Sequence, residues 1–478
     1  MAETHDLDSR YRRVLAELKP RHQEHVLRWW NELTPPQRNQ LLGEIEEIPW
    51  NILDPLIPQL VLARPAKSVP GKLEPAPVFH QKPAPGQETQ YRKAARVGQE
   101  LIRTGKVAAL TVAGGQGTRL GVDGPKGAVV VTPLGHRTLF ELFAESVKAA
   151  RARYDAVIPW YIMTSPANHD QTVDFFETHN HFGLPPDDVV LFAQGMLPAF
   201  DPTGHILLQS KHGLALAPDG HGGTLNALAR SGALADMQSR GVEIISYFQV
   251  DNPLVKAFDP VSLGLHATTG AEMSTKVTPK VDDVERVGNV CVADGKVTII
   301  EYTDLPDELA HARNPDGSRK FNSGNLAIHL FSMTLANRVV GESFRLPFRR
   351  ADKAVPFVDE RGQLVIPQQP NAVKLESFIF DVLPLAGNPL VLEVERAEEF
   401  SPVKNATGVD SLETSQRDQV RRACRWLEQA GVDVPRKPDG EPAVTVVILP
   451  SFALDAADVR AKKDRLPMLE PGDSVVLE

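Results

Sequence analysis

The sequence predicts an α/β protein built on a central, doubly wound and mostly parallel β-sheet. Short apolar runs alternate with amphipathic stretches through the middle of the chain, and this rhythm is typical of β–α–β units with helices on both faces of the sheet. A glycine-rich turn follows the first apolar run, and ligands of open α/β sheets bind beyond the carboxyl ends of the strands. We therefore expect a ligand site at this turn.

Hydrophobic periodicity assigns the elements of this sheet. The expected strands are residues 107–113, 156–165, 188–194 and 242–251, and the expected helices are residues 138–150, 167–179 and 223–237. Thr138 and Glu141 have the spacing of a capping box, which marks the start of a helix. Residues 290–302 break the rhythm and predict a β-hairpin with Asp294 and Gly295 in its turn.

The chain before the sheet predicts a helical lobe. Thr34 and Gln37 form a capping-box pattern around Pro35, which is favoured at the first helical position. The apolar residues that follow share one helical face: Leu41, Leu42, Ile45 and Ile48. Residues 64–88 are rich in proline and predict a semi-extended connector.

The chain after the sheet predicts a small lobe with a helix over residues 412–430 and two short strands. A length of 478 residues is sufficient for several domains. We expect a helical N-terminal lobe with its connector over residues 1–95, a catalytic domain over 96–397 and a small β-containing C-terminal lobe over 398–478.

The composition excludes several classes of protein. The net charge of −9 argues against a nucleic-acid partner held by general electrostatics. No stretch of the sequence reaches 18 uninterrupted apolar residues, so we expect no transmembrane helix. The N-terminus lacks the apolar core of a signal peptide. Cys291 and Cys424 cannot build a disulfide framework. We expect a cytoplasmic protein without a membrane partner, and the oligomeric state stays open.

The glycine-rich turn, "AGGQGTRLGVDGPKG", lies at residues 113–127 and has three interpretations. A Walker A loop is rejected because no glycine–lysine–hydroxyl sequence is present. A dinucleotide fingerprint requires a third glycine at position 120, which is Leu120, so a dehydrogenase is disfavoured. The third interpretation is a nucleotidyltransferase loop, in which bare backbone lies along the phosphates and Arg119 and Lys126 bring positive charge to the reacting phosphorus.

The sequence resembles the eukaryote-type UDP-sugar pyrophosphorylases, and within them most closely the UDP-N-acetylglucosamine pyrophosphorylases. The resemblance rests on the loop and on motifs in the same order along most of the chain. These are residues 163–184, 217–228, 250–255 ("VDNPLV"), 322–331, 374–383 and 399–406 ("EFSPVKNA"). It implies a Rossmann-like nucleotidyltransferase fold related to that of GT-A enzymes.

The resemblance implies that the protein is a uridylyltransferase. In this reaction UTP and a sugar 1-phosphate, most closely N-acetylglucosamine 1-phosphate, give a UDP-sugar and pyrophosphate, with assistance from Mg²⁺ or Mn²⁺. Glucose 1-phosphate and N-acetylgalactosamine 1-phosphate are alternative substrates, and a non-catalytic nucleotide-sugar sensor is an alternative function. A phosphate monoester is largely dianionic at neutral pH, so no general base is required.

The resemblance also implies roles for individual residues. Asp251 ends an apolar run and is expected to bind the metal ion. Arg119, Lys126 and Lys404 are the expected catalytic cations. The expected nucleotide-binding residues are Gly114, Gly115, Gly117, Thr118, Gln194, Gly222 and Gly223. The expected sugar-binding residues are Glu301, Asn325, Phe378 and Phe380.

Some positions depart from the family pattern. Ala193 precedes Gln194 where an acidic residue is common, and His221 stands where asparagine is common. These departures concern details of the contacts with the base. His179 and His181 lack further ligands at zinc spacing, and we interpret them as surface or helix-end residues.

Overall fold

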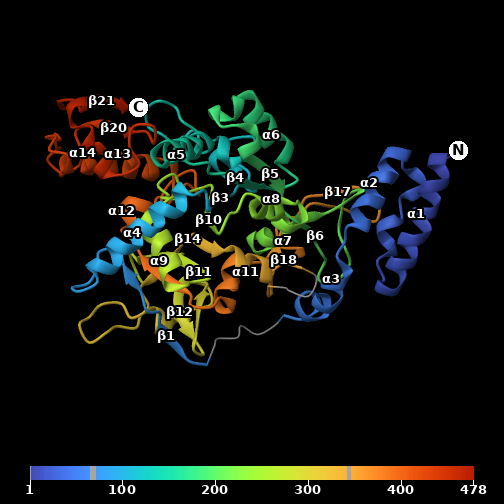
Figure 1. Ribbon diagram of the computed structural model, residues 1–478. Coiled ribbons are helices and arrows are strands. Elements are labelled where there is room, and N and C mark those ends of the chain that lie inside the picture. The colour runs from blue at the N-terminus through green and yellow to red at the C-terminus, as the bar shows by residue number, and fades with distance from the viewer. Residues whose placement is uncertain (1, 65–70, 342–345) are drawn as a thin grey trace. The chain divides into compact units, whose positions relative to one another are not determined.

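The computed structural model describes residues 2–64, 71–341 and 346–478 (Figure 1). The chain forms two compact units. The smaller unit comprises residues 1–68, 194–223 and 346–379, and the larger unit comprises residues 69–193, 224–345 and 380–478. Each unit is described by itself.

The larger unit contains the central sheet. Its strands lie in the order β2 (Phe79–His80), β19 (Leu390–Glu393), β11 (Met273–Pro279), β14 (Ser323–Ser332), β10 (Ile244–Gln249), β3 (Val107–Val112), β4 (Trp160–Thr164) and β5 (Val189–Ala193). Neighbouring strands are parallel except that β14 is antiparallel to both β10 and β11. The prediction of a mostly parallel sheet is confirmed.

The order of the strands creates a switch point next to β3. The chain passes from β3 to β4 and β5 on one side, then returns to place β10 on the other side of β3. Because β3 and β10 are parallel neighbours, their carboxyl ends lie side by side at the same edge. Such a point is where open α/β sheets bind ligands.

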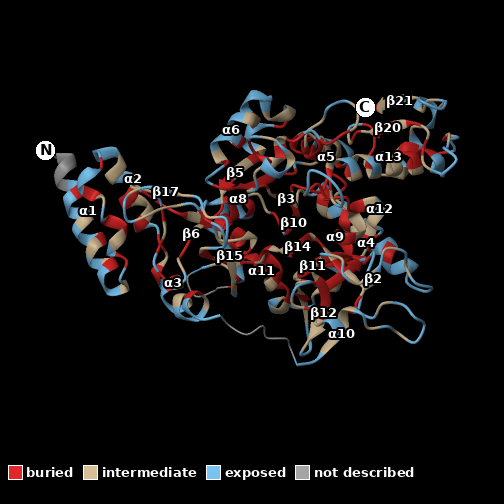
Figure 2. Cartoon of the chain, turned by 180° about the vertical axis from the view of Figure 1, so that it is seen from behind, coloured by how far each residue is buried: buried red, intermediate tan, exposed pale blue. Residues whose placement is uncertain are grey.

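Helices cover both faces of the sheet, as predicted. On one face the Trp160 ring of β4 lies 6.4 Å from Phe140 of α5 (Leu139–Tyr154) and 5.5 Å from Phe176 of α6 (His169–Thr178). On the other face the neighbouring Tyr161 hydroxyl donates a 2.6 Å hydrogen bond to Asp236 of α8 (Ala233–Ser239). Figure 2 shows the central strands as buried, which is why their sequences are apolar without alternation.

The elements around the sheet mostly follow the predicted pattern. The capping box at Thr138 is present and begins α5. Helices α4 (Glu88–Arg103) and α9 (Pro260–Thr269) lie side by side (Figure 1). The hairpin of β12 (Asn289–Ala293) and β13 (Lys296–Ile300) is confirmed, and β1 (Leu73–Pro75) extends it.

The expected helix over residues 223–237 is wrong in one respect, since it is two helices. α7 (Thr224–Arg230) and α8 are separated at Gly232, whose φ of 81° is left-handed. A helix cannot continue through such a residue, and glycine adopts this conformation without strain.

The C-terminal elements form a small core of their own within the larger unit (Figure 1). These elements are α13 (Leu412–Gln429), α14 (Ala456–Ala461) and the parallel strands β20 (Thr445–Ile448) and β21 (Ser474–Leu477). The short helices α10 (Asp307–Ala310), α11 (Met333–Arg338) and α12 (Arg396–Glu399) complete the larger unit.

The smaller unit combines the N-terminal helices with small antiparallel hairpins. The helices are α1 (Ala2–Leu18), α2 (Pro35–Glu46) and α3 (Trp50–Leu56). The hairpins pair β6 (Met196–Pro198) with β9 (Leu216–Pro218), β7 (Leu208–Ser210) with β8 (Gly213–Leu214), β15 (Phe348–Lys353) with β18 (Ala372–Ser377), and β16 (Phe357–Val358) with β17 (Leu364–Val365).

The N-terminal helices pack on these hairpins. The capping box of α2 is confirmed, with the Thr34 N–H donating to Gln37 Oε1 over 2.9 Å. Leu41, Leu42 and Ile45 are fully buried in a core that also contains Phe200 and Val373. The compact units therefore divide the chain differently from the three sequential parts expected above, because residues 194–223 and 346–379 pack with the N-terminal helices. Residues 65–70 of the expected connector lie outside the described residues.

Within the described residues, no helix combines the length and the apolar character needed to cross a membrane.

Candidate active site

The glycine-rich loop leaves the carboxyl end of β3 and folds back on itself. The Gly117 N–H donates to the Gly124 carbonyl over 2.8 Å, and the Lys126 N–H donates to the Gly115 carbonyl over 3.1 Å. These hydrogen bonds close the loop, which contains short helical turns at Thr118–Leu120 and Lys126–Ala128. The backbone of Lys126 is thereby held beside Gly115, close to the end of the strand.

Two glycines of this loop serve different needs. A Cβ atom at Gly117 would lie 3.1 Å from Cβ of Val122 and 3.2 Å from its carbonyl oxygen, so a side chain here would crowd the loop itself. A Cβ atom at Gly115 would have no atom within 4 Å among the described residues. The backbone of Gly115 therefore faces open space, as backbone that approaches an anionic ligand must.

Asn168 holds the start of the loop and was not assigned from the sequence. Its Nδ2 group donates to the Ala113 carbonyl over 3.0 Å and to the Gly115 carbonyl over 3.1 Å. Its Oδ1 atom accepts a 2.8 Å hydrogen bond from the Ser165 N–H, and the residue is 1% exposed. The only signal in the sequence is the position of this asparagine just before α6, in a stretch that resembles the family.

Asp251 follows β10, at the same edge of the sheet as the loop. It is 9% exposed, and its Oδ2 atom lies 3.8 Å from Nζ of Lys126. The Val403 N–H donates to the Asp251 carbonyl over 2.8 Å and so brings the segment before Lys404 to the same place. One carboxylate and two lysines from three distant segments therefore meet at the switch point.

Lys126 experiences four nearby charges. Burial lowers the pKa of its ammonium group, the positive charges of Lys404 and Arg119 lower it further, and the negative charges of Asp251 and Asp410 oppose them. Since these groups interact electrostatically, the expected catalytic cations are close to one another and to the carboxylates of Asp251 and Asp410. Such an excess of positive charge favours an anionic ligand.

Lys404 is more accessible to solvent than Lys126. Its side chain is 39% exposed, its Nζ atom is 3.7 Å from Oδ2 of Asp410, and it lies 5.7 Å from the centre of the Phe400 ring. Its N–H donates to the Asp410 carbonyl over 2.6 Å, which closes a tight loop over residues 404–410. An exposed pair of this kind is weak and can be exchanged for a ligand.

Glu301 and Asn325 flank one glycine. Asn289 of β12 pairs with Ile300 of β13 and with Gly324 of β14, so Gly288 lies between Glu301 and Asn325. The Asn325 N–H donates to the Gly288 carbonyl over 2.8 Å. A register shift in the pairing of β11 with β14 accompanies the left-handed φ of 55° at Ala327.

This shift is a bulge next to Asn325, whose Oδ1 atom accepts from Ala327 N–H (3.1 Å) and Thr275 Oγ1 (3.3 Å). Bulges commonly redirect side chains at sites. With Oδ1 engaged twice, a ligand would meet the Nδ2 donor of this amide more readily.

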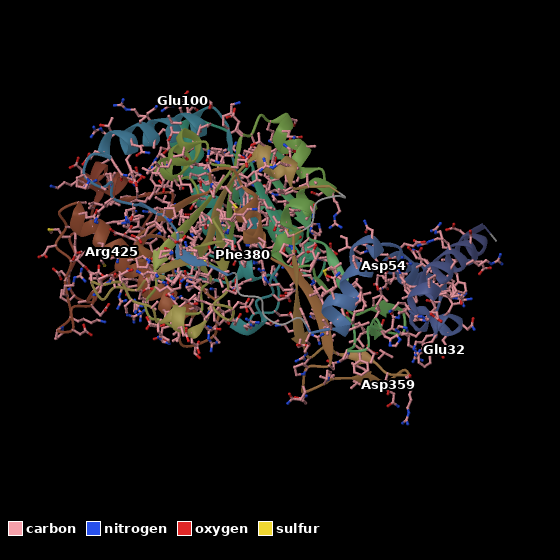
Figure 3. All side chains as sticks on the ribbon, turned by 90° about the horizontal axis from the view of Figure 1, so that it is seen from below. Glu32, Asp54, Glu100, Asp359, Phe380 and Arg425 are labelled. Carbon is pink, nitrogen blue, oxygen red and sulfur yellow. The ribbon has the colours of Figure 1, made fainter. Side chains whose placement is uncertain are left out.

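The two expected aromatic residues belong to different units. Phe380 is 4% exposed and lies among the side chains of the larger unit (Figure 3). Phe378 belongs to the smaller unit and is half-buried, with the Arg349 guanidinium 4.7 Å from the centre of its ring.

The smaller unit carries Gln194, Gly222 and Gly223. Gln194 follows the end of β5 and is 8% exposed. A Cβ atom at Gly222 would lie 2.6 Å from the Phe378 nitrogen, so the glycine is required by the close approach of residues 377 and 378. Packing alone therefore accounts for Gly222, whatever ligand its backbone meets.

His221 joins the same two segments. Its Nδ1 atom accepts a 3.1 Å hydrogen bond from the Ile379 N–H, and its ring centre is 5.3 Å from that of Phe378. Burial lowers the pKa of His221 to about 4, with a smaller contribution from the Arg349 charge. The imidazole is therefore neutral at pH 7.

This neutral histidine predicts a loss of stability in acid. The unfolded chain binds the proton below about pH 6.5, whereas the folded chain binds it only near pH 4, so stability falls as the pH decreases through that window. The cost at pH 5 is about 2 kcal/mol. In thermal unfolding, we expect the Tm of His221→Asn to fall less than the Tm of the wild type when the pH is lowered from 7 to 5. His22→Asn, at an exposed histidine, should behave as the wild type, and an unchanged acid sensitivity of His221→Asn would contradict the assignment.

Within the described residues, no group of three or more His, Cys, Asp or Glu side chains could hold a metal ion. Asp251 offers a buried carboxylate at the group of cations, and Asp410 offers a more exposed one beside Lys404. His179 and His181 lie at the end of α6, where His179 Nδ1 is 2.7 Å from the Phe175 carbonyl and its ring stacks on Phe182.

Comparison with known proteins identifies the family. The model of the family described as UTP--glucose-1-phosphate uridylyltransferase matches residues 80–418. The chain belongs to this family. The predicted resemblance is confirmed, and so is the prediction that the protein is a nucleotidyltransferase.

Individual relatives of this uridylyltransferase-family chain agree. It is 38% identical over 429 residues to UDP-N-acetylhexosamine pyrophosphorylase-like protein 1 of Xenopus tropicalis, covering 86% of this chain and 83% of the relative. It is 35% identical over 431 residues to UDP-N-acetylglucosamine pyrophosphorylase of Saccharomyces cerevisiae, covering 86% and 90%. The crystal structure of uridine diphosphate N-acetylglucosamine pyrophosphorylase from Trypanosoma brucei, in complex with an inhibitor, has a TM-score of 0.79 at 25% identity over 98% of both chains.

In this member of the uridylyltransferase family, the larger unit brings together Arg119, Lys126, Asp251 and Lys404 beside the loop that contains Gly114, Gly115, Gly117 and Thr118. It also places Glu301 and Asn325 on either side of Gly288. Gln194, Gly222, Gly223 and Phe378 belong to the smaller unit.

Proposed function

We propose that this chain transfers uridylate from UTP to N-acetylglucosamine 1-phosphate. An oxygen of the sugar phosphate bonds to the α-phosphorus of UTP, the bond from that phosphorus to the β-bridging oxygen breaks, and pyrophosphate leaves with the bonding electrons. The observation that carries the proposal is the group of Arg119, Lys126 and Lys404 around Asp251 at the switch point of the sheet. The sugar is inferred from the names of the relatives, one of which is UDP-N-acetylglucosamine pyrophosphorylase.

The cations bring two anions together. UTP and a sugar 1-phosphate repel each other, and their approach costs free energy unless positive charge lies between them. The Lys126 side chain is mostly buried, and its backbone is held by the glycine loop. Its charge is therefore weakly screened by water and already in place. Lys404 can exchange its exposed contact with Asp410 for a phosphate oxygen. Catalysis then consists of alignment and charge neutralisation.

Asp251 is the proposed ligand of Mg²⁺, and the residues present fit such an ion. Magnesium is commonly held by one or two carboxylates, with water and substrate phosphates completing its shell, so a group of several protein ligands is not needed. The buried Asp251 carboxylate beside the group of cations satisfies this requirement. When bound, the ion would neutralise phosphate charge and act as a Lewis acid. Mn²⁺ would fit the same oxygen donor.

The remaining residues are proposed to contact the substrates. The backbone of Gly114, Gly115 and Gly117 and the Thr118 residue would lie along the phosphates. Gln194 and the backbone of Gly222 and Gly223 are proposed for the uracil. Glu301 and the Asn325 Nδ2 group are proposed for the sugar hydroxyls, and Phe378 and Phe380 for the walls of the sugar site.

The lowered pKa of Lys126 predicts the alkaline limit of activity. A lysine must be protonated to hold a phosphate, and the pKa of Lys126 is lower than the ordinary lysine value of 10.5. We therefore expect kcat/KM for UTP to fall at a lower pH than an ordinary lysine would give. In Lys126→Arg the fall should move to higher pH, because a guanidinium stays charged. Profiles of kcat/KM against pH for both proteins test this, and superimposable alkaline limbs would contradict it.

The sugar is tested by comparing substrates. Purified protein with Mg²⁺ and UTP should form UDP-sugar from N-acetylglucosamine 1-phosphate with a higher kcat/KM than from glucose 1-phosphate or N-acetylgalactosamine 1-phosphate. A higher value for either of the others would replace the proposed sugar. No product from any of them, in protein whose Tm rises with UTP and Mg²⁺, would contradict the proposed function and favour a sensor. A cytoplasmic location stays a prediction.

A further inference from the structure

The segment that ends at Lys404 is bonded to the residues at the end of β10. We define this segment, Glu399–Lys404, as the Lys404 strap. Asn252 Nδ2 donates to the Glu399 carbonyl over 2.7 Å, and the Ser401 N–H donates to Asn252 Oδ1 over 3.2 Å. Together with the bond from Val403 to Asp251 described above, these contacts run the strap along the Asp251–Asn252 dipeptide.

A buried ion pair fixes the start of the strap. The Glu399 side chain is 1% exposed, and its Oε2 atom is 2.6 Å from Nζ of Lys276. Lys276 comes from the middle of β11, is 5% exposed, and also lies 3.1 Å from Oδ2 of Asp259. The ion pair between Glu399 and Lys276 therefore connects the strap to the interior of the sheet.

Stability alone does not account for this pair. Removing two charges from water is costly, and buried ion pairs are often no more stabilising than apolar residues of the same size. What the pair provides is a single position for the carboxylate. On its outer side the strap is held by α13, where Ser401 Oγ donates to Asp418 Oδ2 over 2.8 Å. Lys404 itself is 39% exposed, so its place depends on the backbone that leads to it.

We propose that Glu399, held by Lys276, is a positioning residue that sets the place of Lys404 relative to Asp251. It acts through the backbone of the strap and touches no substrate. The inference rests on the proposed function only for the role of Lys404. A misplacement of about 1 Å in a reacting centre can cost about 100-fold in rate, so the effect is measurable.

The first test uses hydrogen exchange without substrate. In Glu399→Ala the N–H groups of Ser401 and Val403 should exchange at least tenfold faster, and Glu399→Gln, which keeps an oxygen for Lys276, should restore much of the protection. Glu272→Gln removes a half-buried carboxylate that pairs with Arg338 just before β11 and should leave these amides unchanged. If Glu399→Ala does not fold, Lys276→Met replaces it. Unchanged exchange in the folded variant would overturn the proposal.

The second test is a double-mutant cycle in the uridylyl transfer assay. Glu399→Ala should lower kcat/KM about 10- to 100-fold in the wild-type background and have little further effect in Lys404→Met, because both changes remove one function. An equal loss in both backgrounds would assign Glu399 a structural role and overturn the proposal. An inactive wild type would refute the proposed function alone, since the exchange experiment still decides whether Glu399 fixes the strap.

Discussion

Asp251→Asn is expected to lower kcat by on the order of 10³-fold while the protein stays folded. The substitution keeps the size of the side chain and removes its charge. The proposed ion then loses its carboxylate ligand, and the phosphates lose the charge neutralisation that the ion supplies. The measurement is kcat at saturating UTP and sugar phosphate with Mg²⁺.

A matched control separates this effect from a general loss of charge. Asp464→Asn neutralises an exposed carboxylate on the C-terminal elements and should retain wild-type kcat. An Asp251→Asn variant with more than a tenth of the wild-type kcat would show that Asp251 is not the metal ligand.

Lys126→Met is expected to lower kcat/KM for UTP by about 100- to 1,000-fold. The Lys126 side chain is 16% exposed and stands at the end of the glycine loop, where a charge acts on phosphate with little screening by water. Methionine keeps most of the volume and removes the charge. Arg119 and Lys404 remain, so binding of UTP should weaken but persist.

The stability of this variant should change in the opposite direction from its activity. Burial and two like charges lower the pKa of Lys126, so the folded state carries the protonated lysine at a cost. We expect the Tm of Lys126→Met to equal or exceed that of the wild type, and Lys437→Met, at an exposed position, to change neither quantity. A Tm that falls together with the activity would mean that Lys126 serves the fold.

The sheet could be predicted because its information is local. The residues of β4 are all buried, so an unbroken apolar run is visible in the sequence, and the capping boxes at Thr34 and Thr138 mark helix starts within a few residues. The break at Gly232 was missed because the apolar periodicity continues across it, although the left-handed φ of this glycine ends the helix.

The supports of the site could not be predicted because they join distant segments. Asn168 binds the carbonyls of residues 113 and 115, and Asn252 binds residues 399 and 401. No short-range pattern distinguishes such an asparagine from one in a surface turn. Pairing of residues 194–223 and 346–379 with the N-terminal helices is likewise a tertiary effect that the sequential order conceals.

Glycine is ambiguous for a related reason. The sequence assigns both Gly115 and Gly222 to the nucleotide, yet Gly115 has open space where a side chain would stand and Gly222 has the backbone of Phe378. Only the surrounding chain distinguishes a glycine that leaves room for a ligand from one that leaves room for the protein.

The most direct test of the account is pyrophosphate release from the purified protein. With Mg²⁺, UTP and N-acetylglucosamine 1-phosphate, we predict one pyrophosphate for each UDP-sugar formed, and none when the sugar phosphate is omitted, because the sugar phosphate is the nucleophile. Pyrophosphate release from UTP alone, or no release from folded protein that binds UTP, would contradict a uridylyl transfer centre formed by Asp251 and the cations around it.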